Sequence, residues 1–333
     1  MGTVAIVLDF GFGVVAQQKH GPNWCEFHKQ NHRPSTVCPY VNKSKPSSNP
    51  STKEQSEPKA TSGIEVVKQD IPDAKSLKYL GDAKGLGGAK PKSFLGDSSG
   101  NKFLFKPTPE PFRAEVQAVA SELTALIRPK GSYIPVKVST NAKGQLGSIQ
   151  PFLPDITGDL SHTKPANLTA KEKTDVQQEQ VVDWVISNHD SHGANFGKTK
   201  DGGVLGLDKE QSYRYIGGDK LDTDYHPNKK YDEQPPYYNK LYDAYANKQV
   251  DLNLNEALPV IKKIEAVPDS QWESIAKRYV DSWAKDTKKT DKQKSDKMKA
   301  IMDRKHNVRK DFEQYFSELR KKRGEPAFKF EDE

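Results

Sequence analysis

A short stretch in the middle of the chain places the strongest constraint on the fold. Residues 181–186 are apolar except for one aspartate, and helical spacing of the apolar positions continues up to Asn188. Thr174 and Gln177 form a capping-box pattern before this run, which predicts that a helix begins there. A polar loop follows, and residues 204–207 then form a short apolar strand. The sequence therefore predicts a polar loop held between a buried helix and a buried strand.

The polar side chains of this region are those that phosphoryl transfer requires. Asp190 and Asn195 lie five residues apart in the loop, and Asp208 follows the strand. Transfer of a phosphoryl group needs a carboxylate to orient the attacking hydroxyl and oxygen ligands to hold Mg²⁺ against the phosphates. Asp190 suits the first role, and Asn195 and Asp208 suit the second. The simpler alternative is that Asp190 and His192 only cap the helix and decorate a turn.

A glycine-rich turn and a lysine precede this region. Residues 84–90 include Gly87 and Gly88, and two short apolar strands follow, the second of which is closed by Lys106. Backbone N–H groups of such a turn can lie over phosphates, and the lysine can pair with them. The turn does not match the pattern G-x-G-x-x-G, so an ordinary turn is the alternative.

A helix with two glutamates is predicted next. Residues 112–127 place their apolar side chains on one face, and Glu115 and Glu122 lie seven residues apart on one side of the helix. Either glutamate could pair with Lys106, and we favour Glu115. A solvated glutamate is the alternative for each.

Together these motifs resemble a known family. The pattern His-Asp-x-His-x-x-Asn after a helix rich in Val, Ile and Trp, then Leu-Asp on a strand, is similar to the catalytic and metal-binding loops of the phosphoinositide-kinase-like superfamily. With Phe-Lys-Pro and Phe-Arg-Ala-Glu upstream, the chain resembles most the HipA-like and phage minor-head-protein-like branch, over residues 64–215. One departure is that Lys209 and Glu210, rather than Phe and Gly, follow Asp208.

The resemblance implies an α+β, bilobal protein-kinase-like fold and an ATP-dependent kinase. Such an enzyme uses ATP and Mg²⁺ and transfers the γ-phosphoryl group to a Ser or Thr hydroxyl of a protein, its own included. Residues 133–139 and 145–152 alternate as in a β-hairpin, whose second strand the resemblance makes the hinge beside adenine. The implied roles are catalysis by Asp190, Lys106 and Glu115, nucleotide binding by Gly87, Gly88, Lys106, Gln150 and Phe152, and Mg²⁺ binding by Asn195 and Asp208.

Other functions on such a fold remain open. The minor-head resemblance and the basic C-terminal region are also compatible with a non-catalytic, phage-head-related scaffold protein. A lipid kinase and an adenylyl transferase are further alternatives. The acceptor and the oligomeric state do not follow from these motifs, because substrate choice lies in loops outside the phosphate-handling core.

The N-terminal region contains possible zinc ligands. Two cysteines and two histidines follow the pattern C-x₂-H-x₃-H-x₅-C: Cys25, His28, His32 and Cys38. Such a set could close a tetrahedral Zn²⁺ site and stabilise a small module, and the alternative is a loop with incidental histidines and free thiols. The polar residues that follow predict a flexible linker. We therefore expect a Cys/His leader, this linker, an N-lobe and a C-lobe with a basic terminal helix, at residues 1–40, 41–63, 64–152 and 153–333.

The C-terminal region is predicted to be largely helical. Polar and aromatic residues at 217–245 predict a surface loop, and Ser270 and Glu273 form a capping-box pattern before an amphipathic helix. The formal charge of the chain is +7, and residues 285–323 alone hold 15 Lys and Arg against 7 Asp and Glu. These lysines are more typical of a solvated helix face than of a nucleic-acid site, although contact with nucleic acid stays an alternative.

The cysteine count and the hydropathy favour a cytoplasmic protein. Two cysteines do not make a disulfide framework in a chain of 333 residues, and no apolar run is long enough to span a bilayer. We expect a reducing compartment and no contact with a membrane.

Overall fold

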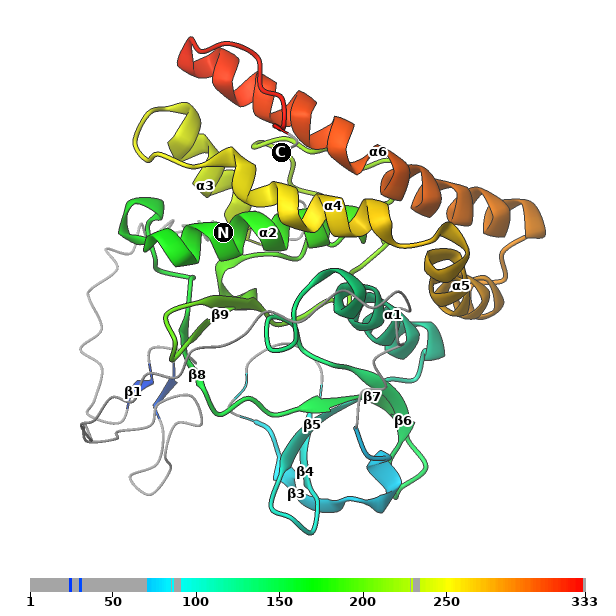
Figure 1. Ribbon diagram of the computed structural model, residues 1–333. Coiled ribbons are helices and arrows are strands. Elements are labelled where there is room, and N and C mark those ends of the chain that lie inside the picture. The colour runs from blue at the N-terminus through cyan, green and yellow to red at the C-terminus, as the bar shows by residue number, and fades with distance from the viewer. Residues whose placement is uncertain are drawn as a thin grey trace, which may run out of the picture.

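The computed structural model describes residues 24–25, 30–31, 71–84, 86, 91–227, 229 and 234–331. A five-stranded antiparallel sheet lies at one end of the molecule and most of the helices at the other (Figure 1). The mixture of helices with an antiparallel sheet that the sequence predicts is confirmed. The proposed zinc ligands, the linker, Gly87 and Gly88 lie outside the described residues, apart from the backbone of Cys25.

The five-stranded sheet has one apolar face. Its strands have the order β3-β4-β5-β7-β6, and all neighbours are antiparallel: β3 (Lys78–Asp82), β4 (Ser93–Gly96), β5 (Lys102–Pro107), β6 (Lys137–Thr140) and β7 (Leu146–Pro151). On its outer face, Phe105 and Ile149 pack against Ile71 and Leu77 in a small separate core. Because side chains alternate along a strand, Lys106 and its neighbours across the sheet point to the opposite, inner face.

Helix α1 (Pro111–Ile127) connects the inner face of the sheet to the helical part. Ser148 Oγ on β7 donates a hydrogen bond of 2.8 Å to Gln117 Oε1 on α1. The apolar side of the same helix, including Val119 and Leu123, belongs to the main core of the protein. α1 thus packs against the sheet with one side and against α5 with another.

The helical part is built around this main core. Its members come from every long helix, and the largest fully buried side chains among them are Trp272, Tyr213, Tyr237, Tyr242, Phe196, Phe312 and Phe316. The long helices after α1 are α2 (Ala170–Val185), α3 (Tyr237–Ala246), α4 (Leu258–Ala266), α5 (Asp269–Asp286) and α6 (Asp291–Arg323). None of the helices in the described part combines the length and the apolarity that a membrane span needs.

A second, smaller sheet lies between these two parts. It has the order β10-β9-β8 and is antiparallel, with β8 (Ile156–Asp159), β9 (Phe196–Thr199) and β10 (Val204–Gly206). The remaining short elements are the paired strands β1 (Trp24–Cys25) and β2 (Gln30–Asn31) and the 3-10 helices η1 (Ala74–Ser76), η2 (Pro165–Asn167), η3 (Gly193–Asn195) and η5 (Leu254–Ala257).

Two predicted helix starts are wrong. Helix α2 begins at Ala170 because Thr169 and Glu172 form the capping box: the Thr169 hydroxyl accepts a hydrogen bond of 3.1 Å from the Glu172 amide, and the Glu172 carboxylate accepts one of 2.8 Å from the Thr169 amide. Thr174 therefore lies inside the helix. Helix α5 begins at Asp269 after Pro268, so Ser270 also lies inside its helix.

The prediction of a surface loop at residues 217–245 is also wrong in part. Residues Tyr237–Ala246 form helix α3, and Tyr237, Tyr238 and Tyr242 are buried. The rings of Tyr238 and Phe196 meet edge to face at 5.3 Å, and Tyr242 packs in the same manner on Tyr315 at 5.4 Å. The polar composition of the segment did not indicate this burial, because tyrosine carries a large apolar ring as well as its hydroxyl.

Candidate active site

The β9–β10 hairpin brings Asn195 and Asp208 together. Asn195 directly precedes β9, and Asp208 follows β10 after one residue. Gly206 lies across from Phe196, and the Leu207 amide extends the pairing with a hydrogen bond of 2.9 Å to the Asn195 carbonyl. The open end of the hairpin therefore carries both of the residues that the sequence predicts as metal ligands.

Lys106 reaches Asp208 from the five-stranded sheet. Its Nζ lies 2.9 Å from Asp208 Oδ2, and the Lys106 side chain is only 9% exposed. A charge-assisted hydrogen bond at this distance, partly shielded from water, is among the stronger polar contacts in a protein. Two residues that are 102 positions apart in the sequence thus meet between the large sheet and the hairpin.

The loop that contains Asp190 folds back on itself beside this pair. Asn195 Nδ2 donates a hydrogen bond of 2.5 Å to the Asp190 carbonyl, and His192 Nε2 lies 3.6 Å from Asp190 Oδ1. The turn also requires Gly193, since a Cβ atom there would lie 2.6 Å from the Cα of Ser161. These contacts hold Asp190 next to the hairpin end that carries Asn195 and Asp208.

A buried carboxylate under the loop holds these parts together. Asp183 on α2 is 2% exposed and accepts hydrogen bonds from four groups. The donors are Lys209 Nζ at 2.5 Å, Asn188 Nδ2 at 2.9 Å, Ser191 Oγ at 2.5 Å and Tyr238 OH at 2.5 Å. Asp183 therefore ties the loop on either side of Asp190, and the residue after Asp208, to a buried helix.

Lys209 and Glu210, which depart from the family pattern, have structural partners here. Lys209 pairs with Glu179 at 2.6 Å as well as with Asp183, and these carboxylates raise its pKa although burial alone would lower it. Glu210 accepts a hydrogen bond of 3.3 Å from Gln117 on α1. The segment after Asp208 is thus anchored to α2 on one side and to α1 on the other.

The expected contact between Glu115 and Lys106 is not present. Glu115 lies near Arg278 and Glu122 on the side of α1 that faces α5, and burial raises its pKa against the effect of Arg278. Positions 115 and 117 point about 200° apart around a helix, so Gln117 faces the site when Glu115 faces away. Among the described residues, the ion pair of Lys106 is the one with Asp208.

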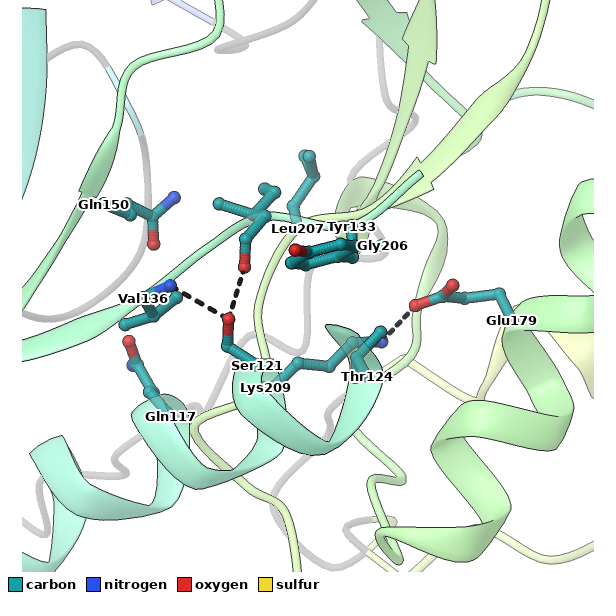
Figure 2. Close-up of a pocket in the computed structure, with 11 residues that line it drawn as sticks. Gln117, Ser121, Thr124, Tyr133, Val136, Gln150, Glu179, Gly206, Leu207 and Lys209 are labelled. Carbon is teal, nitrogen blue, oxygen red and sulfur yellow. Dashed lines mark hydrogen bonds and ion pairs between the residues drawn. The ribbon is translucent and has the colours of Figure 1, made fainter. Parts of the chain in front are cut away.

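Gln150 and Phe152, the expected adenine contacts, lie in surroundings that differ from each other. Gln150 lines a pocket of about 370 Å³, including its opening to solvent, together with Gln117, Tyr133 and Leu207 (Figure 2). The Phe152 amide donates a hydrogen bond of 2.8 Å to the Lys102 carbonyl, and the Phe152 ring meets Phe94 edge to face at 5.1 Å. Gln150 therefore faces α1 and the end of β10, and the backbone amide of Phe152 is already bonded within the sheet.

The basic helix α6 contacts the segment that leads into the Asp190 loop. Arg304 Nη2 pairs with Asp219 Oδ1 at 2.5 Å, and Asp219 Oδ2 lies 2.7 Å from both His189 Nε2 and Ser187 Oγ. The guanidinium of Arg304 also stacks over the Trp184 ring at 3.5 Å. Arg304 is therefore a positively charged residue of α6 that stabilises the fold and is not part of an exposed basic face.

Asp219 makes the stability of the protein dependent on pH. Burial would raise the pKa of its carboxyl, but hydrogen bonds from His189 and Arg304 and the charge of Arg304 hold that pKa well below its usual value. A depressed folded-state pKa adds stability above the unfolded-state pKa of about 3.9, and this stability is lost as the pH falls further. We expect Asp219→Asn to lower the free energy of unfolding at pH 7 and the deficit to shrink below about pH 4.

Urea denaturation at a series of pH values measures this effect. The exposed Asp224, in the same segment, provides the matched control as Asp224→Asn. A deficit for Asp219→Asn that stays constant between pH 7 and pH 3 would contradict the assignment.

The residues at the hairpin end have the chemistry that Mg²⁺ prefers. Asp208 offers a carboxylate, and the amide of Asn195 directs its nitrogen to the Asp190 carbonyl, so that its oxygen points elsewhere. Mg²⁺ takes oxygen ligands and is commonly held by one or two protein groups, with waters and substrate phosphates completing its shell. Within the described ranges, no group of three or more His, Cys, Asp and Glu side chains could hold a metal by itself. The donor set therefore fits Mg²⁺ carried with phosphates.

Sequence reasoning did not find Asp183, Lys209 or Gln117 as parts of the site. A signal for Asp183 was present, because a charged residue inside an apolar helical run must find buried partners. The partners themselves are distant in sequence, up to 55 residues for Tyr238, and do not follow from local spacing.

Comparison with known proteins gives similarities of structure only. No protein-family model matches the chain, and no curated protein matches it by sequence. The crystal structure of the Helicobacter pylori proinflammatory kinase CtkA is similar with a TM-score of 0.45 and 14% identity, over 70% of this chain and 94% of CtkA. The N-terminal 618-residue fragment of LepB from Legionella pneumophila is similar with a TM-score of 0.35 and 16% identity, over 62% of this chain and 46% of the fragment chain.

Proposed function

We propose that this protein is an ATP-dependent kinase with a two-lobed, protein-kinase-like arrangement. In this proposal the five-stranded sheet with α1 is the nucleotide-covering lobe, and the part from α2 onward is the lobe that carries the catalytic loop. The enzyme transfers the γ-phosphoryl group of ATP to a Ser or Thr hydroxyl of a protein, its own chain included.

One observation carries the proposal. Lys106, from the large sheet, forms an ion pair of 2.9 Å with Asp208 at the hairpin end where Asn195 also lies. The large sheet and the β9–β10 hairpin therefore bring a lysine, a carboxylate and an amide side chain to one region, beside the loop that holds Asp190. A cation for phosphates, oxygen ligands for a metal ion and a carboxylate for the acceptor hydroxyl are the groups that phosphoryl transfer uses.

Each residue then has a distinct task. Lys106 pairs with phosphate oxygens, and Asp208 positions its ammonium group before the nucleotide binds. Asp190 orients the acceptor hydroxyl and accepts its proton, while Asn195 keeps the Asp190 backbone in place. Asp208 and Asn195 would hold Mg²⁺, which when bound neutralises charge on the phosphate oxygens. Gly87 and Gly88, which lie outside the described residues, are proposed to contribute to binding of the phosphates.

The contacts around the Asp190 loop support this assignment. Catalytic groups must be held within a fraction of an ångström to be effective, because orientation provides a large part of the rate. The buried Asp183 and its donors fix the loop around Asp190, and Gln117 with Glu210 fixes the segment after Asp208.

Intact-mass measurement tests the proposal. The full chain is incubated with MgATP and a panel of hydroxyl-bearing proteins, beside the Asp190→Asn variant. A phosphate-sized mass gain on the chain or an acceptor, lost in the variant, is the expected result. An adenylyl-sized gain would replace the kinase proposal with nucleotide transfer, and no gain together with no thermal stabilisation by MgATP would favour the non-catalytic scaffold.

A further inference from the structure

A second lysine lies beside Lys106 on the large sheet. The register of β4 and β5 pairs Ser93 with Phe105, and one step further along the same register places Lys92 across from Lys106. Lys92 is held at this point because its carbonyl accepts a hydrogen bond of 2.8 Å from the Ala83 amide on the other side. Residues opposite each other in an antiparallel pair point to the same face, so both lysines point to the inner face.

The two lysines share one electrostatic environment with Asp208. Burial lowers the pKa of Lys92, the neighbouring charge of Lys106 lowers it further, and Asp208 acts in the opposite direction. Lys106 already forms its ion pair with Asp208. Lys92 is thus close enough to both groups to be affected by their charges, and it is half-buried.

Two like charges in this arrangement act against the folded state. Like charges directly opposite on a sheet destabilise it, and partial burial strengthens the repulsion. Lys92 and Lys106 bring two positive charges to a place where Asp208 is the carboxylate that both sense. A bound polyanion would relieve this repulsion, and a row of phosphates matches two adjacent ammonium groups better than a single anion does.

We propose that Lys92 is a second phosphate-binding residue, which contacts the polyphosphate of the nucleotide together with Lys106. This inference deepens the proposed function and rests on it for the identity of the nucleotide. In this proposal the segment after the glycine-rich turn binds phosphate through the side chain of Lys92. This contact is separate from any contacts that the backbone of the turn makes.

Calorimetric titration with MgATP and with inorganic tripolyphosphate tests the inference on the full chain. Lys92→Gln is compared with the parent, with Lys92→Arg, which keeps the charge, and with Lys143→Gln, an exposed lysine in the β6–β7 turn. We expect Lys92→Gln to weaken binding of both probes at least about tenfold, Lys143→Gln to leave it unchanged and Lys92→Arg to restore most of it.

The melting temperature without nucleotide separates binding from a structural role. Because burial and the charge of Lys106 together outweigh the effect of Asp208 and disfavour the charged form of Lys92, the Lys92→Gln protein should melt at the same temperature as the parent or higher. A lower melting temperature with unchanged affinity would identify Lys92 as a structural residue and overturn the inference.

The two proposals can fail separately. If the parent binds MgATP and Lys92→Gln binds it equally well, the inference fails and the kinase proposal stands. If the parent binds tripolyphosphate through Lys92 but does not bind MgATP, the polyanion site stands and the kinase proposal fails. If the parent binds neither probe, both fail.

Discussion

The Asp208→Asn protein is expected to transfer phosphate about a hundredfold to a thousandfold more slowly than the parent, because groups that stabilise developing charge in a preorganised site are each worth about two to three orders of magnitude in rate. The substitution keeps the shape of the side chain and removes its charge. It therefore removes a proposed metal ligand and the partner of Lys106 in one step. The rate is measured as phosphate incorporated per minute at saturating MgATP.

The matched control lies at the other end of the same hairpin. Asp201, in the turn between β9 and β10, has a side chain that is 73% exposed, and Asp201→Asn should transfer phosphate at the parent rate. Circular dichroism shows whether each variant keeps its helical content. A folded Asp208→Asn protein with more than about a tenth of the parent rate would show that Asp208 is not a catalytic residue.

The Asp183→Ala protein is expected to lose about 3–5 kcal/mol of its free energy of unfolding, since removing one partner of a buried ion pair leaves a charge without full compensation. Lys209 would keep Glu179, but the hydroxyls of Ser191 and Tyr238 and the amide of Asn188 would each lose an acceptor. Buried donors without partners are costly in themselves. Urea denaturation followed by tryptophan fluorescence measures the loss.

A surface ion pair provides the comparison for this prediction. Asp296 on α6 pairs with Lys292 at 2.8 Å, and both side chains are mostly exposed, so Asp296→Ala should cost no more than about 1 kcal/mol. Asp183→Asn serves as a second variant if Asp183→Ala does not fold, and it should lie between the alanine variant and the parent. Equal stabilities for Asp183→Ala and Asp296→Ala would refute the anchoring role of Asp183.

Local sequence patterns predicted many of the elements that carry the site. The strand ending at Lys106, the helix from residue 112, the 133–152 hairpin and the strand before Asp208 are all present, with ends that differ by a few residues. Alternation and helical spacing report which face of an element is buried, and this depends on neighbours in the sequence. The start of α2 differs from the prediction because a second capping pattern, at Thr169 and Glu172, lies a few residues before the pattern at Thr174 and Gln177.

The position of Asn195 beside Asp208 can be predicted from the sequence because a hairpin joins the two residues. Two short apolar strands with a tight turn pair locally, so their outer ends must meet. Gln150, in contrast, belonged to a correctly predicted strand but faces α1 and the end of β10, because only the packing of the sheet against α1 decides what lies over that face.

The sequence by itself determined which chemical groups this protein presents: Asp190, Asn195 and Asp208 at element ends, and Lys106 at the end of a strand. Only the tertiary structure decided which of them meet. Lys106 pairs with Asp208 and not with Glu115, since the rotation of α1 is set by its apolar side packing into the main core, and that rotation turns Gln117 to the site and Glu115 toward α5. The physical reason is that burial of apolar area dominates the orientation of a helix, and polar partners form among the groups that this orientation brings together.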